Sequence, residues 1–237
     1  MLRQVQNLDD YPLEIQKAFL EDLIRSQCKQ SLFHLSRNVL GYKDLTISTH
    51  GPIVKILESE TKKKLIVVPR GTFKSTLCSI SYPIWLLIND PNHRILLDSE
   101  LYTNSSKFLR EIKGHLQSQH MTNLFGDFKN DSNWNESEIT IRQRTKIYKE
   151  SSITCSGIGA QKTSQHYSVI IADDMNSPDN SMNPELREKV INHFRLYVSL
   201  LEPNGTLVVV GTRYAMGDLI GHILDGINLD KDKGLVY

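Results

Sequence analysis

The sequence predicts an α/β fold, with a mostly parallel central sheet that helices cover on both faces. Four short stretches are continuously apolar, and stretches with a helical spacing of apolar residues separate them. Strands without polar alternation are typical of parallel sheets that are buried on both faces. At 237 residues, with 39% hydrophobic and 23% charged residues, the chain has the size and composition of one large or two small globular domains.

The expected elements follow from apolar spacing and from the positions of glycine and proline. The buried strands are expected at residues 64–68, 94–98, 168–172 and 206–210. The helices are expected at residues 12–35 (one or two, starting near Pro12), after Gly51 and Pro52, at 75–88 with a kink at Pro83, at 103–119 and at 184–201. Residues 139–155 are expected to be β-like, because Ile139, Ile141 and Ile147 nearly alternate with polar residues.

Charge and cysteine content argue against several classes of protein. The net charge is +1, from 28 Lys and Arg against 27 Asp and Glu, so any nucleic-acid contact is expected to be a local patch. Cys28, Cys78 and Cys155 form no C-x-x-C pair, which argues against a disulfide framework or a zinc site and favours a reducing cytoplasm. The polar N-terminus does not resemble a signal peptide, and the apolar runs are too short for a membrane span.

Three of the four predicted strands run directly into residues that carry chemistry. The first strand is followed by residues 69–76, the third by Asp173 and Asp174, and the fourth by residues 211–213. Because ligands of parallel sheets bind beyond the carboxyl ends of the strands, we expect these three segments to meet at one edge. This convergence is more specific than any one of the segments alone.

The loop after the first strand is a deviant phosphate-binding loop. Lys74 and Ser75 fit the usual pattern G-x-x-x-x-G-K-[ST], but Val68 and Phe73 stand where the two glycines are expected. A Lys-Ser-Thr sequence after an apolar run also occurs by chance, so the interpretation depends on the other strand ends. The residues expected to bind the nucleotide are Pro69, Arg70, Gly71, Thr72, Phe73, Lys74, Ser75 and Thr76.

These residue types suit the hydrolysis of ATP with Mg²⁺. Backbone N–H groups, a helix N-terminus and a lysine, here Lys74, bind a triphosphate. The metal takes a hydroxyl ligand, Ser75, and a carboxylate at the end of a neighbouring strand, Asp173. Asp174 is expected to orient and deprotonate the attacking water. Taken alone, the acidic pair also fits a turn or a helix cap, and Gly211 also fits a strand-ending turn.

On these motifs the chain resembles the ATPase domain of the large terminase subunit of tailed bacteriophages, the motor that packages DNA. Those motors often carry a loop of the form P-R-G-x-x-K-[ST], which residues 69–76 match. The other matching stretches are residues 39–45 followed by His50, and then residues 170–174, 187–190, 194–195, 209–214 and 218–219. The resemblance covers most of the chain.

The resemblance implies a P-loop NTPase fold of the ASCE type with a small helical lid. Residues 1–50 would contribute helices to the lid, residues 51–214 would form the ATPase core, and residues 215–237 would form a C-terminal lid or linker. Hydrolysis of ATP would power the movement of double-stranded DNA. Arg70 would be an extra cation near the phosphates. Thr212 and Arg213 would sense the γ-phosphate and couple hydrolysis to movement.

The resemblance also implies partners and a location. The partners would be double-stranded DNA, the phage portal protein and the small terminase subunit, and copies of the chain would form a ring, a pentamer on the portal. The protein would act in the cytoplasm of the bacterial host and transiently on the procapsid, with no membrane contact and no place in the mature virion. Large terminases carry a nuclease domain after the ATPase. The acids after residue 214 lack a core for a two-metal site, so no nuclease activity is expected.

One departure concerns the arginine that a neighbouring subunit supplies in related motors. The corresponding loop, residues 157–164, has no arginine, and Lys162 is its nearest cation. Lysine lacks the planar fork of arginine, and an exposed, uninvolved Lys162 fits the sequence equally well. Arg142, Arg144 and Lys146 are expected on one strand face and are the other candidates, although most such faces are merely solvated.

Two other functions stay open from the sequence alone. One is another ATP-driven nucleic-acid motor such as a helicase, which should carry further arginine motifs in a second motor domain. The other is a module that binds a nucleotide or phosphate without hydrolysis, as in sulfotransferases with P-R-x-x-x-[ST]-like loops. The acidic pair argues against such a module, which needs no Mg²⁺. Nucleotide binding that does not depend on Mg²⁺ would favour it.

Overall fold

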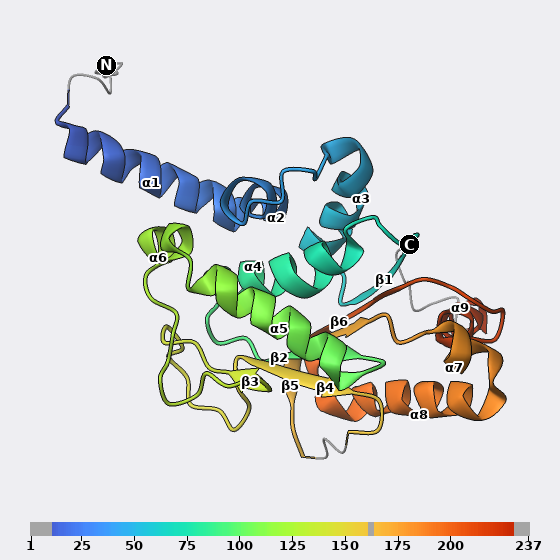
Figure 1. Ribbon diagram of the computed structural model, residues 1–237. Helices are drawn as coiled ribbons and strands as arrows, with labels where there is room; N and C mark the ends of the chain where they lie inside the picture. Colours follow the sequence, from blue (N-terminus) through green and yellow to red (C-terminus); the bar gives the residue numbers. More distant parts are fainter. Residues whose placement is uncertain (1–10, 161–163, 230–237) are drawn as a thin grey trace.

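A six-stranded sheet forms the centre of the computed structural model, which describes residues 11–160 and 164–229 (Figure 1). Its strands are β1 (Lys63–Val67), β2 (Ile95–Ser99), β3 (Glu138–Ile139), β4 (Ile153–Gly157), β5 (Tyr167–Asp173) and β6 (Leu201–Gly211). Their order across the sheet is β1-β6-β5-β2-β4-β3, and every pair is parallel except β3 with β4. The four predicted buried strands are confirmed as β1, β2, β5 and β6, although β6 begins earlier than expected.

Helices precede the sheet and connect its strands. The α-helices are α1 (Leu13–Gln30), α2 (Leu32–His34), α3 (Ile47–Glu58), α4 (Tyr82–Asn89), α5 (Tyr102–Leu116), α6 (Gln119–Phe125), α7 (Pro178–Met182), α8 (Pro184–Leu200) and α9 (Leu219–Leu229). Two π-helical segments are η2 (Leu35–Val39) and η3 (Thr76–Ser81). Over the described ranges, none of these helices is both long enough and apolar enough to cross a membrane.

Several predicted helix boundaries differ from the structure. The first helix ends at Gln30, because Ser31 is extended and its hydroxyl accepts the N–H of His34, which starts α2. α3 begins at Ile47, so Pro52 lies inside the helix and not at its start. The expected helix at 75–88 is π-helical over η3, and Pro83 falls in the first turn of α4. The change of helix type therefore precedes this proline.

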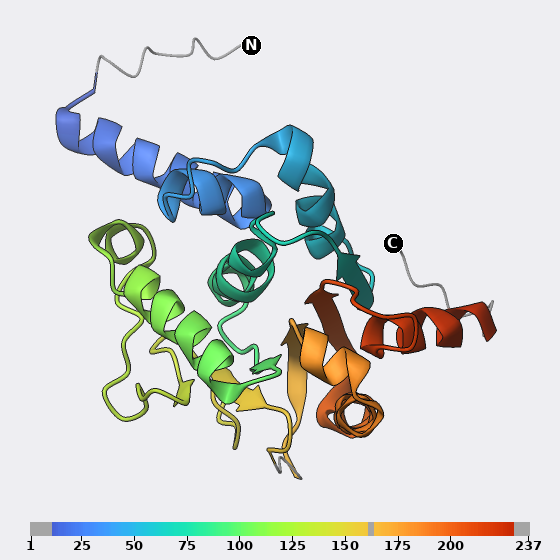
Figure 2. The ribbon, with the colours of Figure 1, turned by 45° about the vertical axis from the view of Figure 1, so that its right-hand side comes forward.

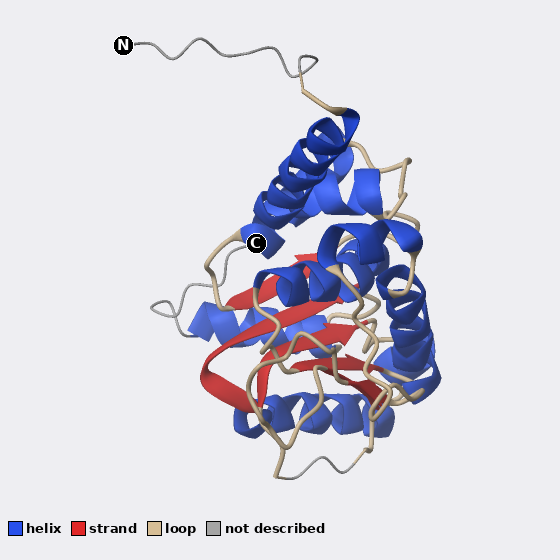
Figure 3. Cartoon of the chain, turned by 90° about the vertical axis from the view of Figure 1, so that its left-hand side faces the viewer, coloured by secondary structure: helices blue, strands red, loops and turns tan. Residues whose placement is uncertain are grey.

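Each face of the sheet carries its own hydrophobic core, as the sequence predicts. Val169 and Ile171 of β5 belong to one core, and Ile170 and Ala172 of the same strand belong to the other. Helices α3, α4 and α5 cover the first face, and α8 and α9 cover the second (Figures 2 and 3). The predicted α/β class is confirmed: the sheet is mostly parallel, helices cover both of its faces, and β6 lies between β1 and β5.

The expectation of β structure over residues 139–155 is mostly wrong. The structure has strands only at its two ends, in β3 and β4, and Ile147 is fully exposed. Between β3 and β4, side chains hydrogen-bond to the backbone in place of a neighbouring strand. For example, Oδ1 of Asn92 accepts hydrogen bonds from the N–H groups of Thr145 and Lys146. Three isoleucines in near alternation were therefore not sufficient to predict a strand.

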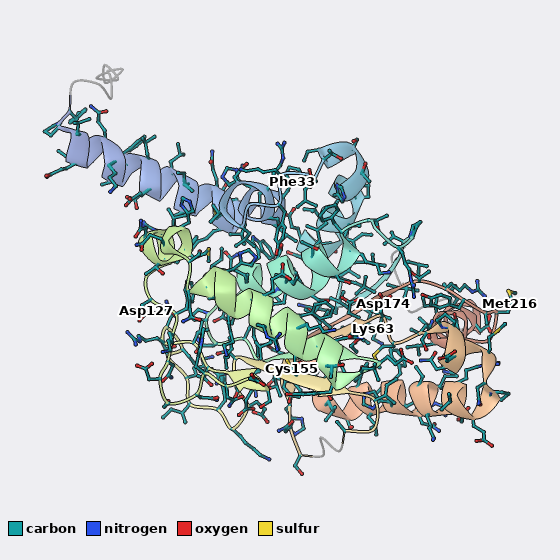
Figure 4. All side chains as sticks on the ribbon, in the orientation of Figure 1. Phe33, Lys63, Asp127, Cys155, Asp174 and Met216 are labelled. Atoms are coloured by element: carbon teal, nitrogen blue, oxygen red, sulfur yellow. The ribbon has the colours of Figure 1, made fainter. Side chains whose placement is uncertain are left out.

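Arg142, Arg144 and Lys146 consequently share no strand face, which corrects their expected arrangement, while a role of any of them toward a neighbouring copy stays a prediction. Arg142 is ion-paired with Asp127 at 2.7 Å. Figure 4 labels Asp127 at the left of the molecule and Asp174 right of its centre, so Arg142 lies away from the acidic pair of its own chain.

Arg144 lies at the other edge of the sheet from the acidic pair of its own chain. Its guanidinium donates to the carbonyl of Glu150 at 2.7 Å and to the carbonyl of His93 at 3.4 Å. His93 precedes β2, so Arg144 lies at the amino ends of the strands. The segments expected to carry chemistry lie at the carboxyl ends.

Candidate active site

The carboxyl ends of β1, β6 and β5 meet at one edge of the sheet, which confirms the predicted convergence. The three strands are parallel neighbours, with Val67 opposite Gly211 and Asp173 opposite Val210. The loop 69–76, the acidic pair and the segment after β6 therefore lie side by side. Because β6 is the middle strand, Thr212 starts from the centre of this edge.

The loop 69–76 has a left-handed backbone at two positions. The φ angle is 80° at Gly71 and 52° at Phe73. Glycine adopts this region freely, whereas an aromatic residue is strained in it. Phe73 stands where the usual pattern has glycine, and its ring packs against buried His50 of α3, with ring centroids 5.6 Å apart. Packing against α3 thus holds a conformation that glycine would adopt without help.

Lys74 is 5% exposed and connects the three strand ends. Its Nζ lies 2.9 Å from Oγ1 of Thr212 and 3.2 Å from Oδ1 of Asp174. Oγ1 of Thr212 in turn donates to the carbonyl of Val68 at 3.3 Å. The structure therefore brings together three of the residues to which the sequence assigned catalytic roles. We call Lys74, Asp174 and Thr212 the lysine cluster.

Asp174 is held in a left-handed conformation with φ of 46°, which Asp tolerates better than most residues. Its N–H donates to the carbonyl of Val210 at 2.9 Å. Within the described part of the chain, no donor is aligned with its Oδ1, so its contact with Lys74 is an ion pair without hydrogen-bond geometry. The side chain is 39% exposed. Asp174 is thus positioned by its backbone, with Oδ1 buried beside Lys74 and the side chain as a whole partly exposed.

Asp173 is buried at the end of β5, and two serine hydroxyls hold its carboxylate. The Oγ of Ser75 donates to Oδ1 at 3.2 Å, and the Oγ of Ser79 donates to Oδ2 at 2.5 Å. Burial raises the pKa of Asp173 to about 6, and the hydrogen bond from Ser79 opposes this rise. The sequence identified Ser75 but missed Ser79. Their spacing of four residues on one helix is the signal that could have found it.

The donors at this edge fit Mg²⁺. The hydroxyl of Ser75 and the carboxylate of Asp173 are hard oxygen donors, and Mg²⁺ is bound through one or two carboxylates together with phosphate oxygens and waters. Among residues 11–160 and 164–229, no group of three or more His, Cys, Asp or Glu side chains could hold a metal ion. A metal ion here would therefore take further oxygens from a bound phosphate, as in Mg²⁺–nucleotide sites.

Arg70 contacts the segment that follows β6. Its guanidinium donates to the hydroxyl of Tyr214 and lies 5.4 Å from the centroid of the Tyr214 ring. The N–H groups of Tyr214 and Ala215 donate to Oδ2 of Asp218, a fully buried carboxylate. The sequence assigned no role to Tyr214 or Asp218. The structure shows that they connect the loop 69–76 to the start of α9.

Arg213 closes its own loop. Its guanidinium donates to the carbonyls of Ala215 and Met216, at 3.4 and 3.2 Å. Figure 4 labels Met216 beside α9. None of the hydrogen bonds described for Arg213 reaches the lysine cluster, so its role as a phosphate sensor stays a prediction.

Lys162 lies outside the described residues, so its assignment also stays a prediction. In the described chain that leads to it, Gly157, Ile158 and Ala160 line a cavity of about 500 Å³ together with Glu100 and Tyr102. This cavity lies at the carboxyl ends of β2 and β4. Residues 69–76 do not line it, so it is separate from the phosphate-binding candidate.

Comparisons with known proteins assign no function to this site. No family model matches the chain, and no curated protein matches it. Among solved structures, it is similar to Saccharomyces cerevisiae Dbp5, a variant bound to Nup159, a variant of Gle1, IP6 and ADP. The identity is 10%, the TM-score is 0.47, and the match covers 84% of this chain and 49% of that chain. This chain spans about half the length of that one, and a likeness at this level carries no functional argument.

Proposed function

We propose that the chain is the ATPase domain of a DNA-packaging motor of the large-terminase kind, which hydrolyses ATP with Mg²⁺ to move double-stranded DNA into a viral procapsid. The observation that supports hydrolysis is the lysine cluster beside the pair of Ser75 and Asp173, at the carboxyl ends of three neighbouring strands. The P-R-G-x-x-K-[ST] loop and the other matching stretches support the kind of motor.

Lys74 would bind the β- and γ-phosphate oxygens of ATP. A triphosphate carries more negative charge than one carboxylate, so it would displace Asp174 from Lys74. The backbone of residues 69–76 and the start of η3 would bind the phosphates from the other side. Since Thr212 already contacts Lys74 through its hydroxyl, a shift of the lysine would be transmitted to the end of β6.

Asp174 would orient and deprotonate the attacking water once Lys74 is engaged by phosphate. Its carboxylate is then available only when nucleotide is bound, which links the base to the presence of substrate. Ser75 and Asp173 would hold Mg²⁺, which neutralises charge on the phosphate oxygens. Arg70 would exchange its contact with Tyr214 for a phosphate oxygen and act as the extra cation.

The chain would work as a ring around DNA. A further cation, Lys162 of the neighbouring copy, would complete each site in the manner of a trans-acting finger. DNA would be held mainly through its phosphates, because packaging cannot depend on sequence. The portal protein and the small terminase subunit would be the other partners, in the host cytoplasm and on the procapsid.

The test is ATP turnover per subunit as protein concentration rises, with and without double-stranded DNA. The proposal predicts Mg²⁺-dependent turnover that increases with concentration, is lost in Lys74→Ala and is retained in Lys55→Ala, an exposed lysine on α3. Tight nucleotide binding without Mg²⁺ and without turnover would instead indicate a binding module. Separation of duplex strands would indicate a helicase.

A further inference from the structure

Ser79 is a buried hydroxyl that the proposed roles at the site do not use. It is 0% exposed on η3, and its Oγ donates to Oδ2 of Asp173 at 2.5 Å. The other carboxylate oxygen, Oδ1, accepts a longer hydrogen bond of 3.2 Å from Ser75. These are the two side-chain hydrogen bonds that the structure describes for the Asp173 carboxylate, one for each oxygen.

The geometry of the first helical turns places both hydroxyls at the same strand end. Ser75 directly precedes η3, and Ser79 follows it by four residues, which is close to one turn of a π-helical segment. Both therefore face Asp173 at the end of β5. A buried carboxylate is stable only when its oxygens are hydrogen-bonded, so the two serines also keep its orientation fixed.

The two serines differ in what happens to them when the metal binds. If Ser75 becomes a direct ligand of Mg²⁺, its oxygen turns to the metal and its hydrogen bond to Oδ1 is given up. Ser79 would keep its hydrogen bond to Asp173 when the metal binds, because it lies one turn further along the helix and is fully buried.

We infer that Ser79 is a positioning residue for metal binding, which holds Oδ2 of Asp173 so that Oδ1 faces the Mg²⁺ of a bound nucleotide. This inference rests on the proposed function, since it assumes that Ser75 and Asp173 hold the metal. Ser79 acts through Asp173 and does not touch the nucleotide. Side chains that orient metal ligands in this way typically change metal affinity about 10- to 100-fold when they are removed.

The chain offers a matched control on the same segment. Ser81 is also 0% exposed on η3, but its Oγ has no hydrogen-bond partner among residues 11–160 and 164–229. Ser81→Ala removes the same buried hydroxyl from the same helix without affecting Asp173. Differences between Ser79→Ala and Ser81→Ala therefore report on the contact with the carboxylate and not on packing.

The experiment measures binding of a fluorescent, non-hydrolysable ATP analogue, first in EDTA and then as Mg²⁺ is added. For Ser79→Ala we expect affinity in EDTA equal to wild type, and a midpoint for Mg²⁺ raised about tenfold or more. Ser81→Ala should match wild type in both. Ser79→Cys keeps the shape of serine with a weaker donor, should fall between, and decides the question if Ser79→Ala does not fold.

The possible contrary results are distinguishable. If Ser79→Ala and Ser81→Ala share one Mg²⁺ midpoint, or if Ser79→Ala weakens binding equally in EDTA and in Mg²⁺, Ser79 has only a structural role and the inference is overturned. If wild type binds the analogue with no dependence on Mg²⁺, both the inference and the proposed function are overturned.

Discussion

Lys74 connects residues that are far apart in the sequence, through two contacts of different kinds. The hydroxyl of Thr212 accepts a hydrogen bond from it, and Asp174 supplies an opposite charge. Together they compensate for the burial of an ammonium group, which is unfavourable unless it is paired. A phosphate ligand must therefore replace Asp174 with at least an equal interaction, which favours highly charged ligands over neutral ones.

Asp174→Asn is expected to separate binding from turnover. Asparagine tolerates the left-handed backbone of this position, so the fold should be kept. Loss of the proposed base should lower ATP turnover about 100-fold or more, and affinity for ATP should stay equal or increase because a negative charge beside the phosphates is gone. Steady-state turnover and equilibrium binding measure the two effects.

Asp179→Asn on α7, an exposed acid close in sequence, is the control and should leave both quantities unchanged. If Asp174→Asn keeps full turnover, Asp174 is not the base.

Asp173→Asn is expected to stabilise the protein without metal or nucleotide at high pH. Burial raises the pKa of Asp173 from its ordinary value of 3.8 to about 6, so the folded state binds a proton more tightly than the unfolded state. The protonated Asp173 therefore adds to the free energy of unfolding below pH 4, and this contribution is lost as the pH rises through about 6. Asparagine carries no charge at any pH, so the variant does not undergo this loss. In wild type the loss lowers the free energy of unfolding by up to about 3 kcal/mol.

Thermal unfolding in EDTA at pH 4 and pH 8 measures the difference. The variant should be more stable than wild type at pH 8 and nearly equal at pH 4, and it should not bind Mg²⁺ with nucleotide. Equal stability at pH 8 would show that the buried carboxylate is compensated better than its pKa implies.

Sequence patterns were sufficient for the residues that follow buried strands and not for those inside helices. Lys74, Asp173 and Thr212 lie in the segments that follow predicted strands, and strand ends in a parallel sheet converge. Ser79 lies within a mostly apolar helix, where its spacing of four residues from Ser75 is the one signal that points to Asp173. Tyr214 was part of a matching stretch, but its contact with Arg70 depends on how two loops fold together.

At the scale of elements, continuous apolar stretches predicted strands well because both faces of the sheet are buried. The stretch 139–155 was mispredicted because its alternation is short and its backbone is held by side chains such as that of Asn92. The π-helical geometry of η3 was also not foreseen. Periodicity over six residues does not distinguish a π-helical segment from an α-helical one.

The start of α9 packs against the loop that follows β6, and two glycines of this helix test that contact. A Cβ at Gly221 would lie 1.8 Å from the carbonyl oxygen of Met216, whereas a Cβ at Gly226 would meet nothing within 4 Å. Gly221→Ala should therefore lower the free energy of unfolding by about 3 kcal/mol, and Gly226→Ala should raise it by about 0.5–1 kcal/mol. Chemical denaturation of both variants measures this.

Gly221→Ala should also slow ATP turnover under conditions in which the protein is folded, because Tyr214 and Arg70 would shift with the loop. Equal free energies of unfolding for Gly221→Ala and Gly226→Ala would show that the loop around Met216 moves aside without loss of stability. The contact between the loop 69–76 and the start of α9 would then contribute little to stability.

At the scale of the whole molecule, sites completed between subunits would behave differently from sites complete within one chain. Lys74→Ala and Lys162→Ala are each expected to be inactive alone. In an equal mixture, about a quarter of the sites would combine an intact Lys74 with a neighbour that keeps Lys162, so about a quarter of wild-type turnover should return. ATP turnover of the mixture at high protein concentration measures this.

If Lys162→Ala is active on its own, so that the equal mixture keeps about half of wild-type turnover, the site is complete within one chain. The sequence gives no direct information on this point, because a contact between copies leaves no periodic pattern in a single chain.

Calorimetric titration of ATP in Mg²⁺ into wild type and Lys74→Ala tests the nucleotide site most directly. Wild type should bind one ATP per chain, and Lys74→Ala, folded as judged by its thermal unfolding, should bind about 100-fold more weakly because a charged hydrogen-bond donor is lost. The control Lys55→Ala should match wild type. Failure of wild type to bind ATP, or equal binding by Lys74→Ala, would contradict the assignment of this strand edge as an ATP site.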